Sequence, residues 1–468
     1  MAILSEWLKH AAAIVGEHNI ITAIPDMEPY SHDEFAQKSI ARMPGAVIRP
    51  ANEGEIAEIV KLCSRMDIPV TVRGGGTGLS GGCVPLDDSI VLSMERLNTL
   101  AEVDTDNHTI TLEAGVTLSR LHQEVEKAGL FFPPHPGDEG AFAGGIVATN
   151  AGGARAVKYG TVKRFVLGLR VVLADGRIVK LGGKFIKSST GYNLLDLMIG
   201  SEGTLGIITQ VTLALLPAPG ALNTLVVPYK TVDDAIQTVP AILKSGIVPL
   251  AVEFVEHSAI HCSERLIKKN WPAHEGSASL MVMLDGSSED EVLRYAEKLA
   301  AVMEAHNALN VLIAENKERQ ADILEIRSML YESLRPGMVE LFDICVPRSE
   351  ISGHVQFVHQ LEQRLKTVLP TYGHAADGNV HTHSMRVTIK DGLLGEEVPG
   401  WQATHEKVKA ELYRDVSARN GVISGEHGIG LVKRDFLAHN LGEINVELMR
   451  SIKKTLDPKG ILNPGKMI

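Results

Sequence analysis

The sequence has few cysteines, no long hydrophobic run and no excess of positive charge. Its four cysteines are far apart among 468 residues and form no Cys-x-x-Cys pair, which argues against a disulfide framework, a thiolate zinc site and an iron–sulfur cluster. No uninterrupted apolar run approaches the ~18 residues that a transmembrane helix requires. Glu6, Lys9 and Glu17 interrupt the segment in which a signal peptide would have its apolar core. We therefore expect a cytoplasmic protein without a transmembrane segment.

The charge balance narrows the class of partner. The formal net charge of −11 argues against nucleic acid or an anionic membrane surface as the main partner. A hydrophobic content of 44% with 22% charged residues is typical of a globular protein, and the length suffices for two or three domains.

The most distinctive local feature is the glycine-rich stretch at residues 73–82, which contains six glycines in ten residues. It follows an apolar, β-branched predicted strand at residues 68–72, and a second predicted strand at 90–94 comes after it. Such a loop exposes backbone N–H groups that can bind an anion, and a diphosphate is the expected ligand. A G-x-G-x-x-G match begins at Gly76, but no helix follows it, which argues against a Rossmann site. No Lys-Ser or Lys-Thr closes the loop, so it is not a P-loop.

Two more glycine-rich segments follow in the same predicted domain. Residues 133–160 break every periodic pattern, and a structureless run of this length in a compact domain is usually functional. Residues 200–206 contain three glycines and lead into an alternating predicted strand at 207–215. Each segment alone is most simply a β-turn. Three of them among strands favour a cofactor site.

The pattern changes after a proline-rich boundary at residues 216–220. Predicted strands at 223–228, 250–256, 278–284 and 309–314 alternate with helices that begin at Thr231 and Ser288. The order β-α-β-β-α-β is typical of a ferredoxin-like split unit.

A cluster of three histidines lies at residues 372–383. Asp377-Gly378 is a strong two-residue hairpin signal, and this turn would place His374 directly opposite His381. Opposed side chains have Cβ atoms about 4.5–5.5 Å apart, close enough for two imidazoles to share a metal. The alternative is a polar hairpin with incidental histidines. A Glu426-His427 pair follows a predicted helix at 403–420, and alone it would be an ordinary loop acid and loop histidine.

Together these motifs resemble the FAD-linked oxidoreductases of the vanillyl-alcohol oxidase fold. The closer resemblance is to the D-2-hydroxyacid dehydrogenase branch, which includes glycolate oxidase large subunits, D-lactate dehydrogenases and D-2-hydroxyglutarate dehydrogenases. It implies an α+β chain with a helical lead-in at residues 1–43 and a PCMH-type FAD-binding domain at 44–220. A ferredoxin-like α/β substrate (cap) domain with a metal site follows at 221–425, and residues 426–468 return to the FAD-binding domain.

The resemblance also implies roles for individual residues. A divalent metal, zinc, iron or manganese, is expected on His374, His381 and Glu426, with His427 as general base. Arg327, Tyr331 and His383 are expected to bind substrate, although Glu325 and Glu332 beside Arg327 leave a plain surface charge open. FAD is expected to bind non-covalently. The residues expected to line it are Arg73, Gly74, Gly75, Gly76, Thr77, Gly78, Gly81, Pro136, Gly137, Gly144, Gly145, Asn150, Gly152, Gly153, Tyr159, Gly160, Glu202, Gly203, Gly206 and Ile207.

The implied reaction is oxidation of a short D-2-hydroxy acid, D-lactate or glycolate, to the 2-oxo acid, with hydride transfer to flavin N5. The electrons would pass to a separate acceptor such as an electron-transferring flavoprotein or an iron–sulfur subunit. Leu341 stands where enzymes for dicarboxylic hydroxy acids carry a lysine, which favours a substrate with an uncharged distal end. Four alternatives stay open: a D-2-hydroxyglutarate dehydrogenase, a non-catalytic FAD-binding electron-transfer subunit, a zinc hydrolase without flavin, and a flavin-dependent lyase or synthase acting on a lipid ether precursor.

Overall fold

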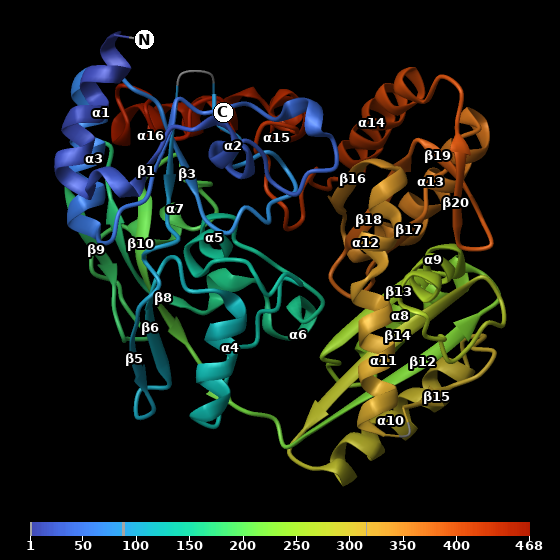
Figure 1. Ribbon diagram of the computed structural model, residues 1–468. Helices are drawn as coiled ribbons and strands as arrows, with labels where there is room; N and C mark the ends of the chain where they lie inside the picture. The colour runs from blue at the N-terminus through green and yellow to red at the C-terminus, as the bar shows by residue number, and fades with distance from the viewer. Residues whose placement is uncertain (1, 87–88, 315) are drawn as a thin grey trace. The chain divides into compact units, whose positions relative to one another are not determined.

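The computed structural model describes residues 2–86, 89–314 and 316–468, which form two compact units (Figure 1). The first unit contains Met1–Gly152, Thr161–Ala218 and Glu426–Ile468, and the second contains Gly153–Gly160 and Pro219–Gly425. The predicted α+β class is confirmed, and so is the return of the C-terminal segment to the first unit. The short segment Gly153–Gly160 folds with the second unit, which no sequence pattern indicated.

The first unit contains two main sheets with helices packed on them. One sheet has the strand order β1-β2-β4-β3, and the other has the order β5-β6-β10-β8-β9. The elements of this unit are α1 (Ala2–Val15), β1 (Ile20–Ile21), α2 (Ile24–Met27), β2 (Ala46–Ile48), α3 (Glu53–Met66), β3 (Val70–Arg73), β4 (Ile90–Ser93), β5 (Leu100–Asp104), β6 (Thr109–Glu113), α4 (Leu118–Lys127), β7 (Leu130–Phe131), α5 (Ala143–Ala148), β8 (Val166–Val172), β9 (Ile178–Gly182), α7 (Leu194–Met198), β10 (Ile207–Ala214), β11 (Leu216–Pro217), α15 (Leu437–Leu441) and α16 (Glu443–Leu456).

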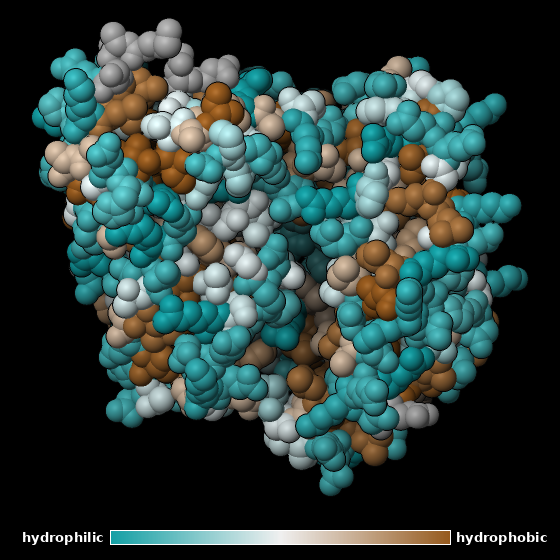
Figure 2. Space-filling view, viewed as in Figure 1, coloured by the Kyte–Doolittle hydropathy of each residue, from teal (hydrophilic) through white to brown (hydrophobic). Residues whose placement is uncertain are grey.

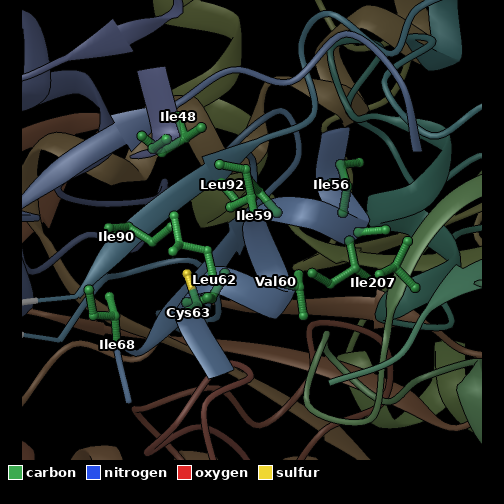
Figure 3. Packing of buried hydrophobic residues seen from close by; sticks show 14 of the residues in the cluster. Ile48, Ile56, Ile59, Val60, Leu62, Cys63, Ile68, Ile90, Leu92 and Ile207 are labelled. Carbon is green, nitrogen blue, oxygen red and sulfur yellow. The ribbon is translucent and has the colours of Figure 1, made fainter. Parts of the chain in front are cut away.

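Helix α3 organises the core of the first unit. The Asn52 side chain caps its N-terminus by accepting a hydrogen bond from the Glu55 N–H, and Asp67 ends it in the left-handed conformation. Its buried face packs against β2, β4 and Ile207 of β10 (Figure 3). Helix α1 lies beside α3 and adds the buried Trp7 to the same cluster (Figure 1). One hydrophobic core therefore joins both sheets.

The predicted helical lead-in at residues 1–43 is correct only as far as Val15. Gly16 has φ 82° and ends α1, because that backbone conformation cannot continue a helix. Pro25 and Pro29 then confine the chain to short turns, and β1 pairs with β2. The lead-in is thus half helix and half irregular chain.

The C-terminal segment pairs with the strand that leads into the glycine-rich loop. The Val70 N–H donates to the Ile461 carbonyl at 2.8 Å, and the Asn463 N–H donates to the Val70 carbonyl at 2.7 Å. Leu462 is fully buried between them in the core of this unit. The last residues of the chain therefore fix the strand that precedes the loop.

The second unit is built on one seven-stranded sheet with the order β15-β12-β14-β13-β17-β18-β16. The first four strands reproduce the order expected of a ferredoxin-like unit, and α8 and α10 pack on them (Figure 1). The elements of this unit are α6 (Ala156–Tyr159), β12 (Ala221–Tyr229), α8 (Val232–Lys244), β13 (Ala251–Glu256), α9 (His257–Ile267), β14 (Ala278–Gly286), α10 (Glu289–Glu304), β15 (Leu312–Ile313), α11 (Lys317–Ser328), α12 (Leu330–Leu334), β16 (Met338–Cys345), α13 (Ile351–Leu365), β17 (Thr371–His374), β18 (Asn379–Met385), β19 (Val387–Lys390), β20 (Leu393–Glu397) and α14 (Trp401–Ala418).

Helix α9, between β13 and β14, was not predicted. Its N-cap residue is Glu256, whose side chain makes no capping bond, and its C-cap is the left-handed Lys268 in place of glycine. The sequence therefore lacks the usual start and stop signals for this helix.

Hydrophilic side chains cover most of the face of each unit that Figure 2 shows, and hydrophobic residues appear there as separate patches. Within the described ranges, each helix is too short or too polar to cross a lipid bilayer.

Replacing Leu462 tests the role of the C-terminal pairing. Leu462→Ala is expected to lower the free energy of unfolding of the first unit by about 2–5 kcal/mol, because it removes a fully buried side chain from a packed core. The measurement is urea denaturation followed by Trp7 fluorescence in a Trp271→Phe, Trp401→Phe background. Leu448→Ala is the matched control, because Leu448 is 60% exposed and its loss should change stability little. Equal effects of the two substitutions would contradict this role.

Candidate functional site

One face of the sheet in the second unit is lined with polar side chains. Residues directly opposite each other in paired strands share a face, and so do alternate residues along a strand. The register pairs Glu253 with His374, Tyr372 with His381, and Leu341 with His383. The resulting shared face carries Glu253, Leu341, Asp343, Tyr372, His374, Asn379, His381 and His383. We call these eight residues the polar face.

The predicted opposition of His374 and His381 is wrong in register. His374 pairs with Asn379, because the turn contains four residues, Ala375 to Gly378, and not the two that Asp377-Gly378 suggested. The Asp377 and Gly378 N–H groups both point back to the His374 carbonyl. The error amounts to two positions along β18, so both histidines stay on one face. Their ring centroids are 5.3 Å apart and nearly perpendicular.

Glu253 links two of the predicted site residues. Its Oε1 lies 2.6 Å from His374 Nδ1, and its Oε2 accepts a hydrogen bond from Arg327 Nε at 2.9 Å and another from Arg327 Nη2. The carboxylate is fully buried. Burial alone would raise the pKa of Glu253, but the charges and hydrogen bonds of His374 and Arg327 outweigh it and hold that pKa at about 2. The ionised carboxylate therefore orients the imidazole and the guanidinium together.

The predicted substrate residues gather around Tyr372. The Arg327 guanidinium lies over the Tyr372 ring, 4.8 Å from its centroid. The Tyr372 hydroxyl is 3.3 Å from His383 Nε2, and the His383 ring centroid is 6.5 Å from that of Tyr331 on α12. Arg327 is thus not a plain surface charge, since its side chain is only 16% exposed. Its role towards a substrate stays a prediction.

The loop that leads to the Glu426-His427 motif is anchored on Asp343. The Ser424 hydroxyl donates to Asp343 Oδ2 at 2.8 Å, and the Gly425 N–H donates to the Asp343 carbonyl at 3.1 Å. His381 Nε2 lies 3.6 Å from Asp343 Oδ1. Gly425 is the last residue of the second unit, and the next two residues are the predicted third ligand and the predicted base.

In the first unit the glycine-rich loop presents unused backbone donors. Over the described part of the chain, no protein group accepts a hydrogen bond from the N–H groups of residues 74–78. A Cβ at Gly75 would lie 2.6 Å from the Gly140 carbonyl oxygen, and Gly76 has φ +78°. Any larger side chain would therefore deform the loop. The row of exposed N–H groups has the chemistry that binds an anion.

Positive charge lies beside this loop. The Arg73 guanidinium donates to the His32 carbonyl at 2.5 Å and lies 5.6 Å from the Tyr30 ring centroid. Burial raises the pKa of Asp33 to about 6, against the lowering effect of backbone N–H groups and of Arg73. A hollow of about 470 Å³ opens next to Gly74 and Gly75, with Tyr30 and Phe142 in its wall. Its volume is in the range of cofactor and ligand pockets.

The second glycine element lies against the first. A Cβ at Gly74 would be 3.7 Å from the Cα of Gly145, whose own Cβ position faces open space. Asn150, at φ 51°, accepts a hydrogen bond from the Lys163 N–H. A Cβ at Gly152 would lie 2.7 Å from Glu426 Oε2, so a larger residue there would displace that carboxylate from its present position. These two elements together could cradle an extended dinucleotide.

Three predicted cofactor residues at the end of this element, Gly153, Tyr159 and Gly160, fold with the second unit. The Tyr159 hydroxyl donates to Asp285 Oδ2 at 2.8 Å, and the Lys158 ammonium binds the other oxygen of the same carboxylate. Gly153 and Gly160 bound this segment. Their cofactor roles stay predictions, and the structure gives the Tyr159 hydroxyl a protein partner.

The third glycine element holds the segment of the predicted base. Glu202 Oε1 accepts a hydrogen bond from the Ile429 N–H at 2.7 Å, and Oε2 accepts one from the Gly430 N–H at 2.8 Å. The Ser80 hydroxyl, from the glycine-rich loop, is within 3.0 Å of the carbonyls of His427 and Gly428. Burial raises the pKa of Glu202, whereas the two N–H groups and Lys433 lower it. We call residues 427–430 the base segment.

The sequence did not predict a role for Glu253 or Tyr372. It also did not predict the hydrogen bonds from Ser80 and to Glu202 that hold the base segment. Glu253 is an acidic residue inside an otherwise apolar strand, and that interruption is the one signal that could have found it. The contact between Ser80 and His427 spans 347 residues of sequence, so no local pattern could indicate it.

The fold and the two sites define a class of protein: a two-unit α+β chain with an anion cradle in one unit and a histidine-rich polar face in the other. Residues 44–182 match the family described as FAD binding domain, and residues 218–467 match the family described as FAD linked oxidases, C-terminal domain. The chain belongs to the FAD-linked oxidase family and is an FAD-linked oxidoreductase. The resemblance inferred from the motifs is confirmed.

Individual relatives are similar along nearly the whole chain. D-lactate dehydrogenase of Archaeoglobus fulgidus is 42% identical over 96% of this chain and 97% of its own length. Glycolate oxidase subunit GlcD of Bacillus subtilis is 36% identical over 94% of this chain and 91% of its own length. The solved structure of p-cresol methylhydroxylase with substrate bound matches with a TM-score of 0.81 at 16% identity, covering 100% of this chain and 97% of that one, and supports the fold alone.

Glu202→Gln tests whether the buried carboxylate holds the base segment. The amide oxygen can replace only one of the two acceptors, and its NH2 group would face a backbone N–H. Loss of one buried bond costs about 1–3 kcal/mol, so the Ile429 and Gly430 amides should exchange roughly tenfold faster or more in hydrogen–deuterium exchange. The exposed Glu443→Gln is the control. Unchanged exchange in Glu202→Gln would rule this anchoring out.

Proposed function

We propose that the protein oxidises a short D-2-hydroxy acid, D-lactate or glycolate, to the 2-oxo acid, using FAD and a divalent metal. The observation that supports this most is the polar face, which gathers His374, His381 and His383 with Glu253 on one sheet. Glu253 is hydrogen-bonded to His374 and to Arg327 of α11. The names of the full-length relatives, D-lactate dehydrogenase and glycolate oxidase subunit, favour the same substrate class.

The donor set of the polar face suits a divalent cation. Glu253 accepts a hydrogen bond from His374 Nδ1, which leaves Nε2 as the ligand atom; carboxylates orient metal-bound histidines in this way. We assign the cation, zinc, iron or manganese, to His374, His381 and Glu426, three protein ligands that leave positions for substrate. When bound, such a cation acts as a Lewis acid towards the hydroxyl and one carboxylate oxygen of a 2-hydroxy acid.

His427 is the proposed general base. An imidazole titrates near neutral pH and can accept the substrate hydroxyl proton at physiological pH. The bonds from Ser80 and to Glu202 hold the backbone of the base segment from the His427 carbonyl onward. A general base must lie within hydrogen-bond distance of the proton that it accepts, so a fixed backbone around it favours this role.

The proposed role of Arg327, Tyr331 and His383 is to orient the substrate. Arg327 keeps a fixed position through Glu253 and Tyr372, and a guanidinium has the planar geometry that suits a carboxylate. Leu341 shares the polar face and is directly opposite His383, so the distal end of the substrate would meet an apolar side chain.

FAD, when bound on the glycine cradle, supplies the acceptor for the hydride that leaves the substrate Cα. The fit rests on the unused N–H groups of residues 74–78 and on the neighbouring Gly145. We propose that a separate protein, an electron-transferring flavoprotein or an iron–sulfur subunit, receives the electrons. The four widely spaced cysteines of this chain do not form a cluster motif.

A substrate screen tests the proposed function. The oxidised flavin band of the purified enzyme should bleach under anaerobic conditions with D-lactate or glycolate, and the L-enantiomer of lactate should leave it unchanged. No bleaching by any 2-hydroxy acid would contradict the proposal and would favour a lyase or synthase, or a non-catalytic electron-transfer subunit.

Two substitutions separate metal binding from flavin binding. His374→Ala should abolish hydroxy-acid oxidation while the FAD content stays at the wild-type level, because the cradle lies in the other unit. Glu253→Gln should weaken the metal by roughly 10- to 100-fold, since it removes the acceptor that orients His374. Metal content and activity are measured before and after chelation. A His374→Ala enzyme with near-normal turnover after chelation would refute the metal assignment.

Leu341→Lys tests the substrate preference. A second carboxylate beside a leucine would lose water without gaining a partner, which costs several kcal/mol in a closed site. Wild type should therefore favour D-lactate over D-2-hydroxyglutarate in kcat/KM, and the lysine should shift the ratio towards the diacid. An unchanged ratio, or a wild type that prefers the diacid, would show that Leu341 does not set specificity.

A further inference from the structure

A second group of metal-ligand side chains lies in the first unit. It consists of His122 on α4 together with His135 and Glu139, from the segment that follows β7. One ligand atom from each of the three lies within 4.8 Å of the other two. None of the three belongs to the polar face, and the proposed reaction uses none of them.

The distances between these atoms suit a bound cation. Glu139 Oε1 is 3.4 Å from His122 Nδ1 and 3.0 Å from His135 Nε2. A tetrahedral ion with bonds of about 2.1 Å has its ligand atoms about 3.4 Å apart. The two imidazole rings are stacked, with centroids 5.4 Å apart and an interplanar angle of 9°, so a shared ion is supported by the two distances to Glu139 Oε1. From this geometry we propose that His122, His135 and Glu139 form a second divalent transition-metal site.

Backbone hydrogen bonds join the start of α4 to the loop that contains Glu139. Thr117 caps α4 and fixes its first turn, and His122 follows in the second turn. The Ser119 N–H donates to the Glu139 carbonyl at 3.0 Å, and the Leu118 N–H donates to the Ala141 carbonyl at 2.8 Å. The loop that carries Glu139 is therefore tied to the start of the helix that carries His122. Convergence of the three side chains follows from ordered backbone.

The donor set indicates which cation the site would take. Two imidazole nitrogens and one carboxylate favour zinc, copper or nickel over calcium and magnesium, which prefer oxygen ligands. The side chains of His122, His135 and Glu139 are 24%, 35% and 48% exposed, so water can complete the coordination shell. The site resembles in composition a two-histidine, one-carboxylate zinc centre with an open position.

A cation here would clamp a particular segment. His135 lies between Pro134 and Pro136, in the glycine- and proline-rich segment expected to line FAD. Bridging His135 to His122 restrains that segment against α4, which is part of the same unit. The inferred role is structural stabilisation of the loop, separate from the chemistry on the polar face.

Zinc counting on the FAD-loaded enzyme tests this site. Competition with a chelating dye of known affinity gives the number of Zn²⁺ equivalents that each variant holds. His122→Gln and Glu139→Gln should each hold one equivalent fewer than wild type, or hold it about 100-fold more weakly or worse, because a direct ligand is lost. The exposed His10→Gln should match wild type. Wild-type FAD content and a wild-type unfolding midpoint in the zinc-free state show that each variant is folded, and the exposed Glu139 keeps the test valid if His122→Gln unfolds.

The reaction-centre metal is distinguished by a fourth variant. His374→Ala should lose a different equivalent, and combining it with Glu139→Gln should remove both. If Glu139→Gln holds as many equivalents as wild type with equal affinity, the second site is overturned and the three side chains form only ion pairs. If His374→Ala loses none while Glu139→Gln loses one, the proposed reaction-centre metal fails and the second site stands.

Discussion

The position of the base segment in the first unit depends on hydrogen bonds with two glycine-rich elements, the loop at residues 73–82 and the segment at 200–206. Glu202 accepts two backbone hydrogen bonds from this segment, and the single Ser80 hydroxyl proton is shared between two of its carbonyls. Gly428 and Gly430 are required there, since a Cβ would lie 2.9 Å from Glu202 Oε1 in the first case and 2.0 Å from the Ser80 carbonyl oxygen in the second. The loops that offer N–H groups to a diphosphate thus also fix the residues around His427. The loops proposed to bind the cofactor therefore also place the proposed base.

In the second unit, the register of the paired strands determines where the side chains of the polar face lie. The polar face places eight side chains by the alternation of four strands, and Glu253 joins His374 to Arg327 across it. A buried carboxylate with two cationic partners is costly to disturb, because removal of one partner leaves an uncompensated charge. The network therefore fixes the orientation of both a proposed metal ligand and a proposed substrate residue.

Much of this could be predicted from sequence, and the failures have physical reasons. The glycine-rich loop could be predicted because its backbone conformation, such as φ +78° at Gly76, is one that glycine favours. The hairpin error of two positions left His374 and His381 on one face, since strand periodicity is two. Helix α9 was missed because it lacks capping signals, and Glu253 because its partners come from distant segments. Assignment of residues 153–160 to the second unit depends on Asp285, which no local pattern connects to Tyr159.

The central claim is that oxidation of a 2-hydroxy acid requires the cation on the polar face together with FAD. Anaerobic stopped-flow reduction of the flavin by D-lactate, with hydrogen or deuterium at C2, tests it most directly in enzyme that is metal-depleted and then reloaded. The account predicts that reduction stops on depletion, returns on reloading, and is slowed by deuterium because the C2–H bond breaks in the measured step. Reduction at an unchanged rate in the metal-depleted enzyme would contradict it.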